Sequence, residues 1–356
     1  MVESVTRIVV IGAGQAGLSV AYYLKRFDLV PDVDFILVDR GPGAGGAWQF
    51  RWEELRLGTA HRISDLPGMD ALGVSFDTAD RTVPARDVVA DYYRRYEDYY
   101  DLRVRRPARA TGVANRDADL AVTTSDGDIR THFVVNATGT WGAPFIPYYP
   151  GMRSFAGRQV HTADYSSAQD FAGQRVIVVG AGTSAVGFLM ELEGVAASTQ
   201  WATRSPADFR DEIELSPESS AAAVAMQDDA ARAGRALPSI VSGTGVPRTR
   251  RIAAAIARGI LTDRRMFSRI EERGVRWPDG SFSPADTIIW ATGFRPEARQ
   301  LAPLKLREKA GGLTVAGGAS WTDPRIFFAG YGPQASTVGA GRAGRMIARQ
   351  IVAALG

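Results

Sequence analysis

The sequence predicts an α/β fold that contains two separate βαβ units. Residues 7–26 (RIVVIGAGQAGLSVAYYLKR) and 175–193 (RVIVVGAGTSAVGFLMELE) each pass from a β-branched run through a glycine-rich turn into apolar residues at helical spacing. A second strand-like segment follows each of them, at 34–40 (DFILVDR) and 199–204 (TQWATR). Strands that are joined through a helix pair in parallel, so each unit predicts a parallel sheet. The interval between the units is too long for a solenoid repeat and indicates two domains.

The composition is that of an ordinary globular protein and excludes several kinds of site. Of the 356 residues, 45% are hydrophobic and 23% are charged, and the formal net charge is +3. The chain has no cysteine, which removes a disulfide framework, a thiol nucleophile and a cysteine zinc site. Three scattered histidines offer no cluster of ligands, so no metal is expected.

Two features of the sequence bear on partners and location. The arginine clusters at 103–109 and 247–251 are short, and we interpret them as solvated faces or phosphate contacts rather than nucleic-acid sites. The uncharged stretch from Ile8 to Leu24 contains three glycines and is shorter than the ~20 apolar residues of a membrane span. No pattern typical of a signal peptide precedes it. We therefore expect a cytoplasmic protein that binds neither nucleic acid nor a membrane.

The first glycine turn has the features of a dinucleotide site. In Gly12-x-Gly14-x-x-Gly17, the first glycine permits the tight turn, the second lets a diphosphate approach the backbone, and the third lets helix and strand pack closely. Free N–H groups at the helix N-terminus attract phosphate. Asp39, at the end of the second strand, is placed to accept the ribose hydroxyls of an unphosphorylated dinucleotide such as FAD or NAD.

The second glycine turn differs at the position that selects the nucleotide. After Gly180-x-Gly182-x-x-Ala185 and its second strand comes Arg204 instead of an acid. A guanidinium can form two hydrogen bonds to a 2′-phosphate that a carboxylate would repel, and the hydroxyl of Thr203 could add another. This unit is predicted to bind NADPH, with NADH tolerated. One acidic and one basic partner in the same chain indicate two cofactors, with FAD as redox centre and NADPH as reductant.

Two segments with the same ending divide the chain into domains. HFVVNATG (132–139) and DTIIWATGF (286–294) each run an apolar strand into Ala-Thr-Gly. Later, RIFFAGYG (325–332) leads into the apolar and alanine pattern of a closing helix. We predict that an FAD-binding domain is interrupted by an NAD(P)H-binding domain with a helical insertion, which is either a solvent-facing helix pair or a lid over the substrate. The predicted bounds are 1–150 and 292–356 for the FAD-binding domain, 151–291 for the NAD(P)H-binding domain and about 205–265 for the insertion.

The segment FAGRQVHTADY fits the pattern Phe-x-Gly-x-x-x-His-x-x-x-Tyr, with Phe155, Gly157, His161 and Tyr165 at the named positions. This pattern resembles the fingerprint of the class B flavoprotein monooxygenases, which include flavin-containing, N-hydroxylating and Baeyer–Villiger monooxygenases. The likeness extends to both glycine turns, both Ala-Thr-Gly strands and GGAW at 45–48, so it covers nearly the whole chain. In order and spacing, the chain is similar to the short bacterial members.

The resemblance implies a disulfide-reductase-like pair of nucleotide domains and an FAD-dependent, NADPH-using monooxygenase. In that family NADPH reduces FAD, and O₂ then adds to form a C4a-hydroperoxyflavin that oxygenates small sulfides or amines, or ketones in other members. Water must stay out of the site until the substrate arrives. The expected partners are a small-molecule substrate and O₂, and a homodimer remains an open assembly state.

The resemblance also gives some residues a role near the reaction. His161 is expected to position the nicotinamide domain. Tyr165 is followed by Ser166, where Baeyer–Villiger enzymes have Trp followed by Pro or Asp, and this difference favours heteroatom oxygenation. Flavin-containing members carry an Asn beside the flavin, and the segment LRLGTAHRISD (55–65) of this chain has no Asn. The candidates for that place are Thr59, His61 and Arg62.

The residues expected to bind the two cofactors lie in the glycine turns, the strand ends and the segments beside them. They are Gly12, Gly14, Gln15, Ala16, Gly17, Asp39, Arg40, Gly46, Ala47, Trp48, Arg56, Ala110, Thr138, Gly139, Gly180, Gly182, Thr183, Ser184, Ala185, Thr203, Arg204, Ala291, Thr292, Gly293 and Gly330. Among the aromatic residues, Trp48 is the one expected beside the flavin. Tyr331 and Gln334 are candidates for the substrate pocket.

Other functions that use two nucleotide domains are weighed against this prediction. A thioredoxin-reductase-like enzyme needs a redox-active cysteine pair, which the chain lacks. An NAD(P)H oxidase or electron-transfer reductase needs only the two cofactors and remains open. A flavoprotein that binds nucleotides without turnover, as a sensor, is the alternative that is not an enzyme.

Overall fold

The computed structural model describes residues 4–60, 63–211, 217–238 and 245–356. These residues form two compact units, here called unit 1 and unit 2. Unit 1 holds the chain up to residue 142 together with 224–238 and 296–356, and unit 2 holds 143–223 and 239–295. Each unit contains a sheet with parallel central strands and helices in the βαβ order of a dinucleotide-binding fold, so the predicted fold class is confirmed.

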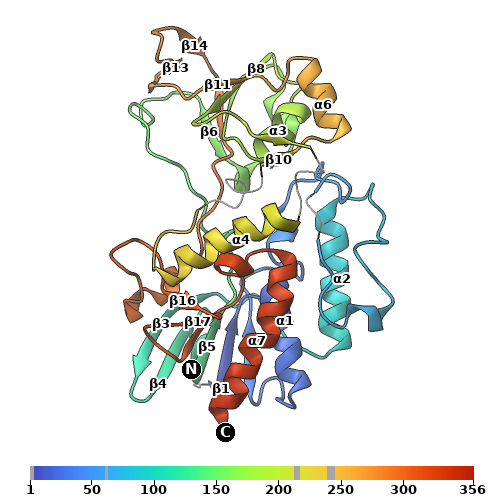
Figure 1. The fold of residues 1–356 in the computed structure, drawn as a ribbon, viewed down its shortest axis with the longest axis vertical. Helices are drawn as coiled ribbons and strands as arrows, with labels where there is room; N and C mark the ends of the chain where they lie inside the picture. Colours follow the sequence, from blue (N-terminus) through green and yellow to red (C-terminus); the bar gives the residue numbers. More distant parts are fainter. Residues whose placement is uncertain (1–3, 61–62, 212–216, 239–244) are drawn as a thin grey trace. The chain divides into compact units, whose positions relative to one another are not determined.

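The strands of unit 1 are β1 (Ser4–Ile11), β2 (Phe35–Val38), β3 (Ala110–Arg116), β4 (Asp119–Thr124), β5 (Gly127–Asn136), β16 (Val315–Ala316), β17 (Ala319–Ser320) and β18 (Ile326–Phe328). They form one eight-stranded sheet, seen in Figure 1. Its centre is parallel, with β1 between β2 and β5, and β18 on the other side of β5. The antiparallel hairpin β3–β4 extends from β5. The β-branched residues that predict β1 are buried because elements pack on both faces of this parallel centre.

The helices of unit 1 are α1 (Gln15–Arg26), α2 (Ala85–Tyr99), α7 (Thr337–Leu355) and the later part of α4 (Pro217–Arg232). Figure 1 shows α1 and α7 side by side. Their close approach depends on Gly344, because a Cβ there would lie only 2.7 Å from the backbone carbonyl carbon of Ser19. Ser336 caps α7, since its Oγ accepts the N–H of Gly339 at 2.9 Å. The predicted closing helix therefore packs directly on the helix that follows the first glycine turn.

Unit 2 is built on a five-stranded, wholly parallel sheet in the order β11–β8–β7–β15–β6. Its strands are β6 (Arg158–His161), β7 (Arg175–Val179), β8 (Ser198–Thr203), β11 (Asp263–Arg265) and β15 (Thr287–Trp290), and its helices include α3 (Thr183–Glu191) and α6 (Arg250–Ala257). An antiparallel meander and a short parallel ladder complete the unit. The meander consists of β12 (Arg269–Glu271), β13 (Gly274–Arg276) and β14 (Phe282–Pro284), and the ladder of β9 (Phe209–Arg210) and β10 (Val246–Pro247).

The boundaries of the two units differ from those predicted. The chain divides after Gly142 and before Pro296, and part of the predicted insertion, residues 224–238, groups with unit 1. The reason is apolar contact, because Ala231 of α4 is buried in the same cluster as Tyr331. Such a contact between distant segments leaves no local pattern in the sequence. Within the described ranges, no helix is long and apolar enough to cross a membrane.

Candidate cofactor sites

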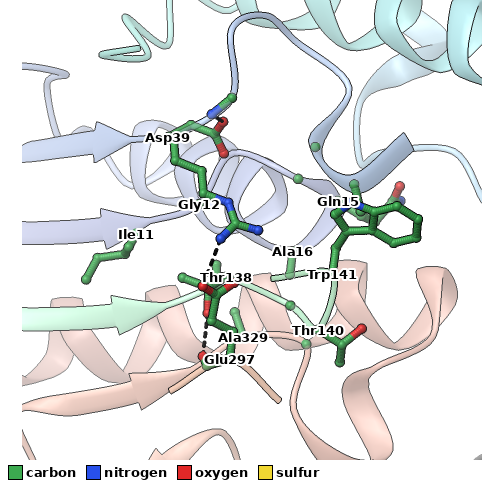
Figure 2. Close-up of a pocket in the computed structure, with 18 of the residues that line it drawn as sticks. Ile11, Gly12, Gln15, Ala16, Asp39, Thr138, Thr140, Trp141, Glu297 and Ala329 are labelled. Carbon is green, nitrogen blue, oxygen red and sulfur yellow. Dashed lines mark hydrogen bonds and ion pairs between the residues drawn. The ribbon is translucent and has the colours of Figure 1, made fainter. Parts of the chain in front are cut away.

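A cavity in unit 1 lies where β1, β2, β5 and β18 reach their carboxyl ends (Figure 2). This is the edge at which open parallel sheets bind ligands. Thirteen of the residues predicted to bind a cofactor line it: Gly12, Gly14, Gln15, Ala16, Asp39, Arg40, Gly46, Ala47, Trp48, Ala110, Thr138, Gly139 and Gly330. The sequence also placed Gln334 near a pocket, for substrate, and Gln334 lines this same cavity.

The glycines of the first turn bring backbone close to backbone around the cavity. Gly12 has φ +105°, and a Cβ there would lie 2.6 Å from the carbonyl oxygen of Ala137. A Cβ on Gly46 would lie 2.7 Å from the Cα of Gly14. Gly14 is the N-cap residue of α1 and has no side chain to bond the N–H groups of the first turn. These N–H groups and the positive end of the helix dipole are therefore available to an anionic ligand.

Asp39 holds the two loops at the edge of the sheet in place. The carboxylate is buried, and its Oδ2 accepts the N–H of Ala13 at 2.8 Å while Oδ1 accepts the N–H of Gly41 at 2.7 Å. Each carboxylate oxygen can accept a second hydrogen bond. Asp39 can thus fix the glycine turn and still accept the ribose hydroxyls predicted for it.

An ion pair forms another part of the wall. Arg40 Nη1 lies 2.8 Å from Glu297 Oε1, and Thr138 donates its hydroxyl to the Glu297 carbonyl at 2.6 Å. Figure 2 shows Thr138 and Glu297 joined in this way. Both sides of the pair stand next to Gly142, where a Cβ would overlap the Arg40 guanidinium and the Glu297 carboxylate. The end of the strand β5 is therefore held to the segment that begins at Pro296.

Several buried polar atoms in this wall fit a polar ligand. Arg51 Nε, Glu297 Oε2 and Gln334 Oε1 line the cavity and make no hydrogen bond with any part of the chain that the structure describes. Leaving such an atom unsatisfied costs about 1–3 kcal/mol each. A ligand that carries phosphate, hydroxyl and ring amide groups, as FAD does, can satisfy atoms of all three kinds. The residues present therefore fit the predicted FAD.

The second glycine turn repeats the backbone geometry of the first. Gly180 has φ +132°, and a Cβ there would overlap the carbonyl oxygen of Ala291. Its N–H donates to Ala202 at 3.0 Å, and its carbonyl accepts Trp201 Nε1 at 2.6 Å. Gly182 is the N-cap residue of α3 and supplies no side-chain cap. Unit 2 thus has a second helix N-terminus of the phosphate-binding kind.

Arg204, the basic residue predicted to serve the second glycine turn, is solvent-exposed, whereas the neighbouring Thr203 is buried. Arg204 is exposed at the carboxyl end of β8, where a 2′-phosphate could reach it. Thr203, predicted to offer a hydroxyl to the nucleotide, is buried and donates that hydroxyl to Asp263 Oδ2 at 2.6 Å. The only hydroxyl proton of Thr203 is therefore donated to Asp263 on the neighbouring strand. The sequence gave no signal for Asp263, which comes from a strand 60 residues later in the chain.

His161 holds the Ala-Thr-Gly turn within unit 2. Its Nδ1 accepts the N–H of Ala163 at 3.1 Å, and its Nε2 lies 2.9 Å from the carbonyl oxygen of Gly293, to which it donates. Burial lowers the pKa of His161, against the opposing effect of its hydrogen bond to Gly293. One nitrogen accepts and the other donates, so the ring is the neutral tautomer. His161 therefore positions Gly293 and has no free nitrogen for acid–base work.

Tyr165 and Phe155 complete the fingerprint as packing residues. The ring of Tyr165 is buried and stacks on Phe188 with centroids 4.0 Å apart, and its hydroxyl donates to Glu191 Oε2 at 3.0 Å. The Tyr165 side chain is therefore part of the packing of unit 2. Gly157 is required because a Cβ there would lie 2.5 Å from the ring of Phe155. The fingerprint thus describes how β6 joins the sheet of unit 2.

The remaining predicted residues lie away from the cavity lining. Thr59 is exposed and donates its hydroxyl to the carbonyl of Arg56 at 3.1 Å, and neither residue lines the cavity. His61 and Arg62 lie outside the described residues. Tyr331, a candidate for the substrate pocket, is buried, and its hydroxyl accepts the N–H of Leu313. Tyr331 therefore packs in the core of unit 1 and does not line the cavity.

Other predicted residues support the turns from behind. Gly17 lets α1 sit against the turn, since a Cβ there would overlap the carbonyl oxygen of Gly12. Ala185 is buried at the start of α3, and Thr183 and Ser184 stand in its first turn. Thr292 donates its hydroxyl to the carbonyl of Phe145. Three lining residues that the sequence did not single out as cofactor-binding are Arg51, Trp141 and Glu297.

Comparison with known proteins agrees with this architecture. Residues 9–230 match the family described as pyridine nucleotide-disulphide oxidoreductase. The structure of a flavin-containing monooxygenase from Stenotrophomonas maltophilia is similar over 99% of this chain and 100% of that one, with a TM-score of 0.80 and 31% identity. A doubly substituted variant of that flavin monooxygenase gives 0.82 and 32% at the same coverage.

Two curated relatives match over shorter regions. An uncharacterized CzcO-like oxidoreductase of Geobacillus kaustophilus is 32% identical over 190 residues, which are 53% of this chain and 52% of that protein. The senecionine N-oxygenase of Tyria jacobaeae is 27% identical over 217 residues, which are 55% of this chain and 46% of that protein. The matched regions thus span about half the length of these curated relatives.

Two βαβ units, each with a glycine turn opening a helix, define a two-nucleotide oxidoreductase fold. The chain belongs to the pyridine nucleotide-disulphide oxidoreductase family and, within it, to the class B flavin-containing monooxygenases of bacterial type.

Proposed function

We propose that the protein is an FAD-dependent, NADPH-using monooxygenase that oxygenates small sulfides or amines. The observation that carries the proposal is the full-length similarity to the flavin-containing monooxygenase of Stenotrophomonas maltophilia, together with the buried polar atoms of the unit 1 cavity that await a ligand. When bound, FAD accepts hydride from NADPH and activates O₂ for transfer to a nucleophile.

The residues around the cavity bind and orient this cofactor. Asp39 accepts the ribose hydroxyls while its two bonds to backbone N–H groups hold the loops still. Gly12, Gly14 and the start of α1 receive the diphosphate. The helix α7 begins beside Gln334 and Ser336 in the same wall, so its positive end favours negative charge on a bound ring.

Unit 2 delivers the reductant in this proposal. Arg204 takes the 2′-phosphate of NADPH, and the first turn of α3 takes the diphosphate. His161 fixes the turn at Gly293 and keeps the loop in one conformation. The exposure of Arg204 suits a nucleotide that must enter and leave in every cycle, and NADH remains an acceptable, weaker donor.

The substrate class rests on chemistry and on one relative. An enzyme that activates O₂ beside a flavin can transfer oxygen to a soft sulfur or nitrogen, and the senecionine N-oxygenase of Tyria jacobaeae acts on nitrogen by its name. Tyr165 followed by Ser166 departs from the ketone-oxidising pattern. We therefore place amines and sulfides before ketones as substrates.

The test is turnover with isotopically labelled O₂. The purified protein with FAD and NADPH should consume NADPH faster when a small sulfide or tertiary amine is added, and mass spectrometry should find one labelled oxygen in the product. A protein that oxidises NADPH and releases only hydrogen peroxide, with every sulfide, amine and ketone tried, would be the alternative NAD(P)H oxidase or electron-transfer reductase.

A further inference from the structure

Arg51 is a cation in the wall of the unit 1 cavity that no described acid neutralises. It follows directly after the 3₁₀ turn Gly46–Phe50, and its guanidinium carbon lies 4.2 Å from the ring centroid of Trp141 and 5.6 Å from that of Trp48. Its Nε is buried without a hydrogen-bond partner. Burial lowers the pKa of Arg51 to about 10, which leaves it charged at neutral pH.

Arg51 has no ion-pair partner among the described residues of the cavity lining. Among its described lining residues the acids are Asp39 and Glu297, and the cations are Arg40, Arg51 and Arg109. Asp39 accepts two backbone N–H groups, and Glu297 pairs with Arg40. No lining acid is therefore left for Arg51. The two tryptophan rings attract the Arg51 guanidinium only weakly. An anion bound beside the guanidinium would stabilise its positive charge more strongly.

The backbone around Arg51 shows where such an anion would lie. Gly46, five residues before Arg51, approaches Gly14 so closely that a Cβ on Gly46 would lie 2.7 Å from the Cα of Gly14. Gly14 starts α1, whose first N–H groups face the same space. The N-terminal end of α1 and the 3₁₀ turn that leads to Arg51 therefore lie side by side in the cavity wall, where a diphosphate on this helix N-terminus would have Arg51 nearby.

We propose that Arg51 binds the diphosphate of the FAD molecule held in unit 1, as a side-chain cation added to the backbone N–H groups of the glycine turn. This inference rests on the proposed function, because it takes FAD as the ligand. The two tryptophan rings contact the guanidinium, and its N–H groups would donate to the phosphate oxygens. Trp48 and Trp141 are positioning residues in this arrangement.

The experiment uses apo-protein and three probes that divide FAD into its parts. Riboflavin carries the ring without phosphate, ADP carries the diphosphate without the ring, and FAD carries both. Affinities are measured by calorimetry for the wild type, Arg51→Gln, Arg51→Lys and the control Arg95→Gln. Arg95 pairs with Asp91 on the exposed side of α2, so the control removes one positive charge away from the cavity.

We expect Arg51→Gln to weaken FAD and ADP about tenfold to hundredfold, the usual effect of a lost charge-assisted bond, and to leave riboflavin unchanged. Arg51→Lys should recover part of the loss, and the salt dependence of ADP binding should be shallower in Arg51→Gln than in the wild type. Circular dichroism of each variant checks that it is folded.

Three other outcomes would overturn the inference. Unchanged ADP affinity in a folded Arg51→Gln protein would leave Arg51 a packing residue. A loss of affinity for riboflavin alone would mean that Arg51 contacts the flavin ring and not the diphosphate. A wild-type apo-protein that binds none of the three probes would overturn the proposed function itself, which is distinct from a failure of the variant alone.

Discussion

The two glycine turns of this chain share a backbone but differ in what surrounds them. In each, a glycine with positive φ presses against the carbonyl of an Ala-Thr-Gly segment, through Gly12 and Ala137 or through Gly180 and Ala291. In unit 1 a buried carboxylate, Asp39, ties the turn to the next loop. In unit 2 the corresponding buried hydrogen bond joins Thr203 to Asp263, and the cation that follows the strand, Arg204, is exposed to solvent.

In the proposed function, this difference would separate a site for a resident cofactor from a site for an exchanging one. Residues that line the unit 1 cavity have buried polar atoms without a hydrogen-bond partner among the described residues, and a ligand that satisfied them would stabilise the folded protein. The unit 2 turn has satisfied its buried hydroxyl and offers an exposed Arg204, so its empty state costs little. In the proposed function, unit 1 would hold one dinucleotide for long periods and unit 2 would let another come and go.

The largest expected effect comes from adding a methyl group to each turn. Gly12→Ala forces an L-residue to φ +105° and a Cβ against the Ala137 carbonyl, and should abolish FAD binding. Gly180→Ala should abolish NADPH binding while FAD is retained. Flavin absorbance after gel filtration measures the FAD that each variant retains. Titration with NADPH measures the affinity of each variant for NADPH. In α3, Gly187→Ala is the control because a Cβ there meets nothing within 4 Å; if it behaves like Gly180→Ala, the turn is not the cause.

The next effect isolates the carboxylate that distinguishes unit 1. Asp39→Asn keeps the shape but removes the charge and one acceptor for Ala13 or Gly41, so FAD should bind about tenfold to hundredfold more weakly. The affinity for NADPH should not change, because the contacts of Asp39 are all in unit 1. Fluorescence titration of the apo-protein with FAD measures the loss. Asp126→Asn, at an exposed turn, is the matched control, and equal losses in both variants would contradict the role of Asp39.

The exposed arginine of unit 2 should have a smaller and more selective effect. Arg204→Ala removes a charged contact to the 2′-phosphate in a solvated position, so the Kd for NADPH should rise about tenfold while that for NADH stays within about twofold. Stopped-flow reduction of the flavin at several concentrations of each nucleotide gives both constants. Equal losses for NADPH and NADH would assign Arg204 to the diphosphate or to folding instead.

The sequence predicted the parts of both sites that lie within one short segment. Gly12, Gly180 and Asp39 were identified because turn geometry and the spacing to the next strand are local properties. The sequence could not identify Arg51 or Glu297, because their neighbours in the cavity come from segments far along the chain.

For two other predicted residues, the structure shows contacts that the sequence does not reveal. A sequence motif does not say whether a side chain faces a ligand or the core. Tyr165 matched a fingerprint position, but its ring fills the space beside Phe188, and the hydroxyl of Thr203 was already committed to Asp263. Packing and hydrogen-bond partners of this kind become visible only when the distant elements are placed together.

The smallest expected effect concerns the pH response of unit 2. Burial lowers the pKa of His161 below its ordinary value of 6.5, so the neutral ring contributes stability that is fully present above about pH 6.5 and is lost as the pH falls through the lowered pKa. The reason is that protonation would remove the acceptor that Nδ1 offers to the Ala163 N–H. His161→Gln keeps a donor for Gly293 but does not titrate.

Urea unfolding of the wild type and His161→Gln at pH 7.5 and pH 5.5 measures this response. The variant should be less stable by about 1–2 kcal/mol at pH 7.5, the usual effect of one lost hydrogen bond in the interior. The difference should shrink at pH 5.5, since only the wild type loses stability by taking up a proton on unfolding. If the two proteins differ in free energy of unfolding by the same amount at both pH values, His161 has the same pKa in the folded and the unfolded chain. Its hydrogen bonds to Ala163 and Gly293 would then not depend on the neutral ring.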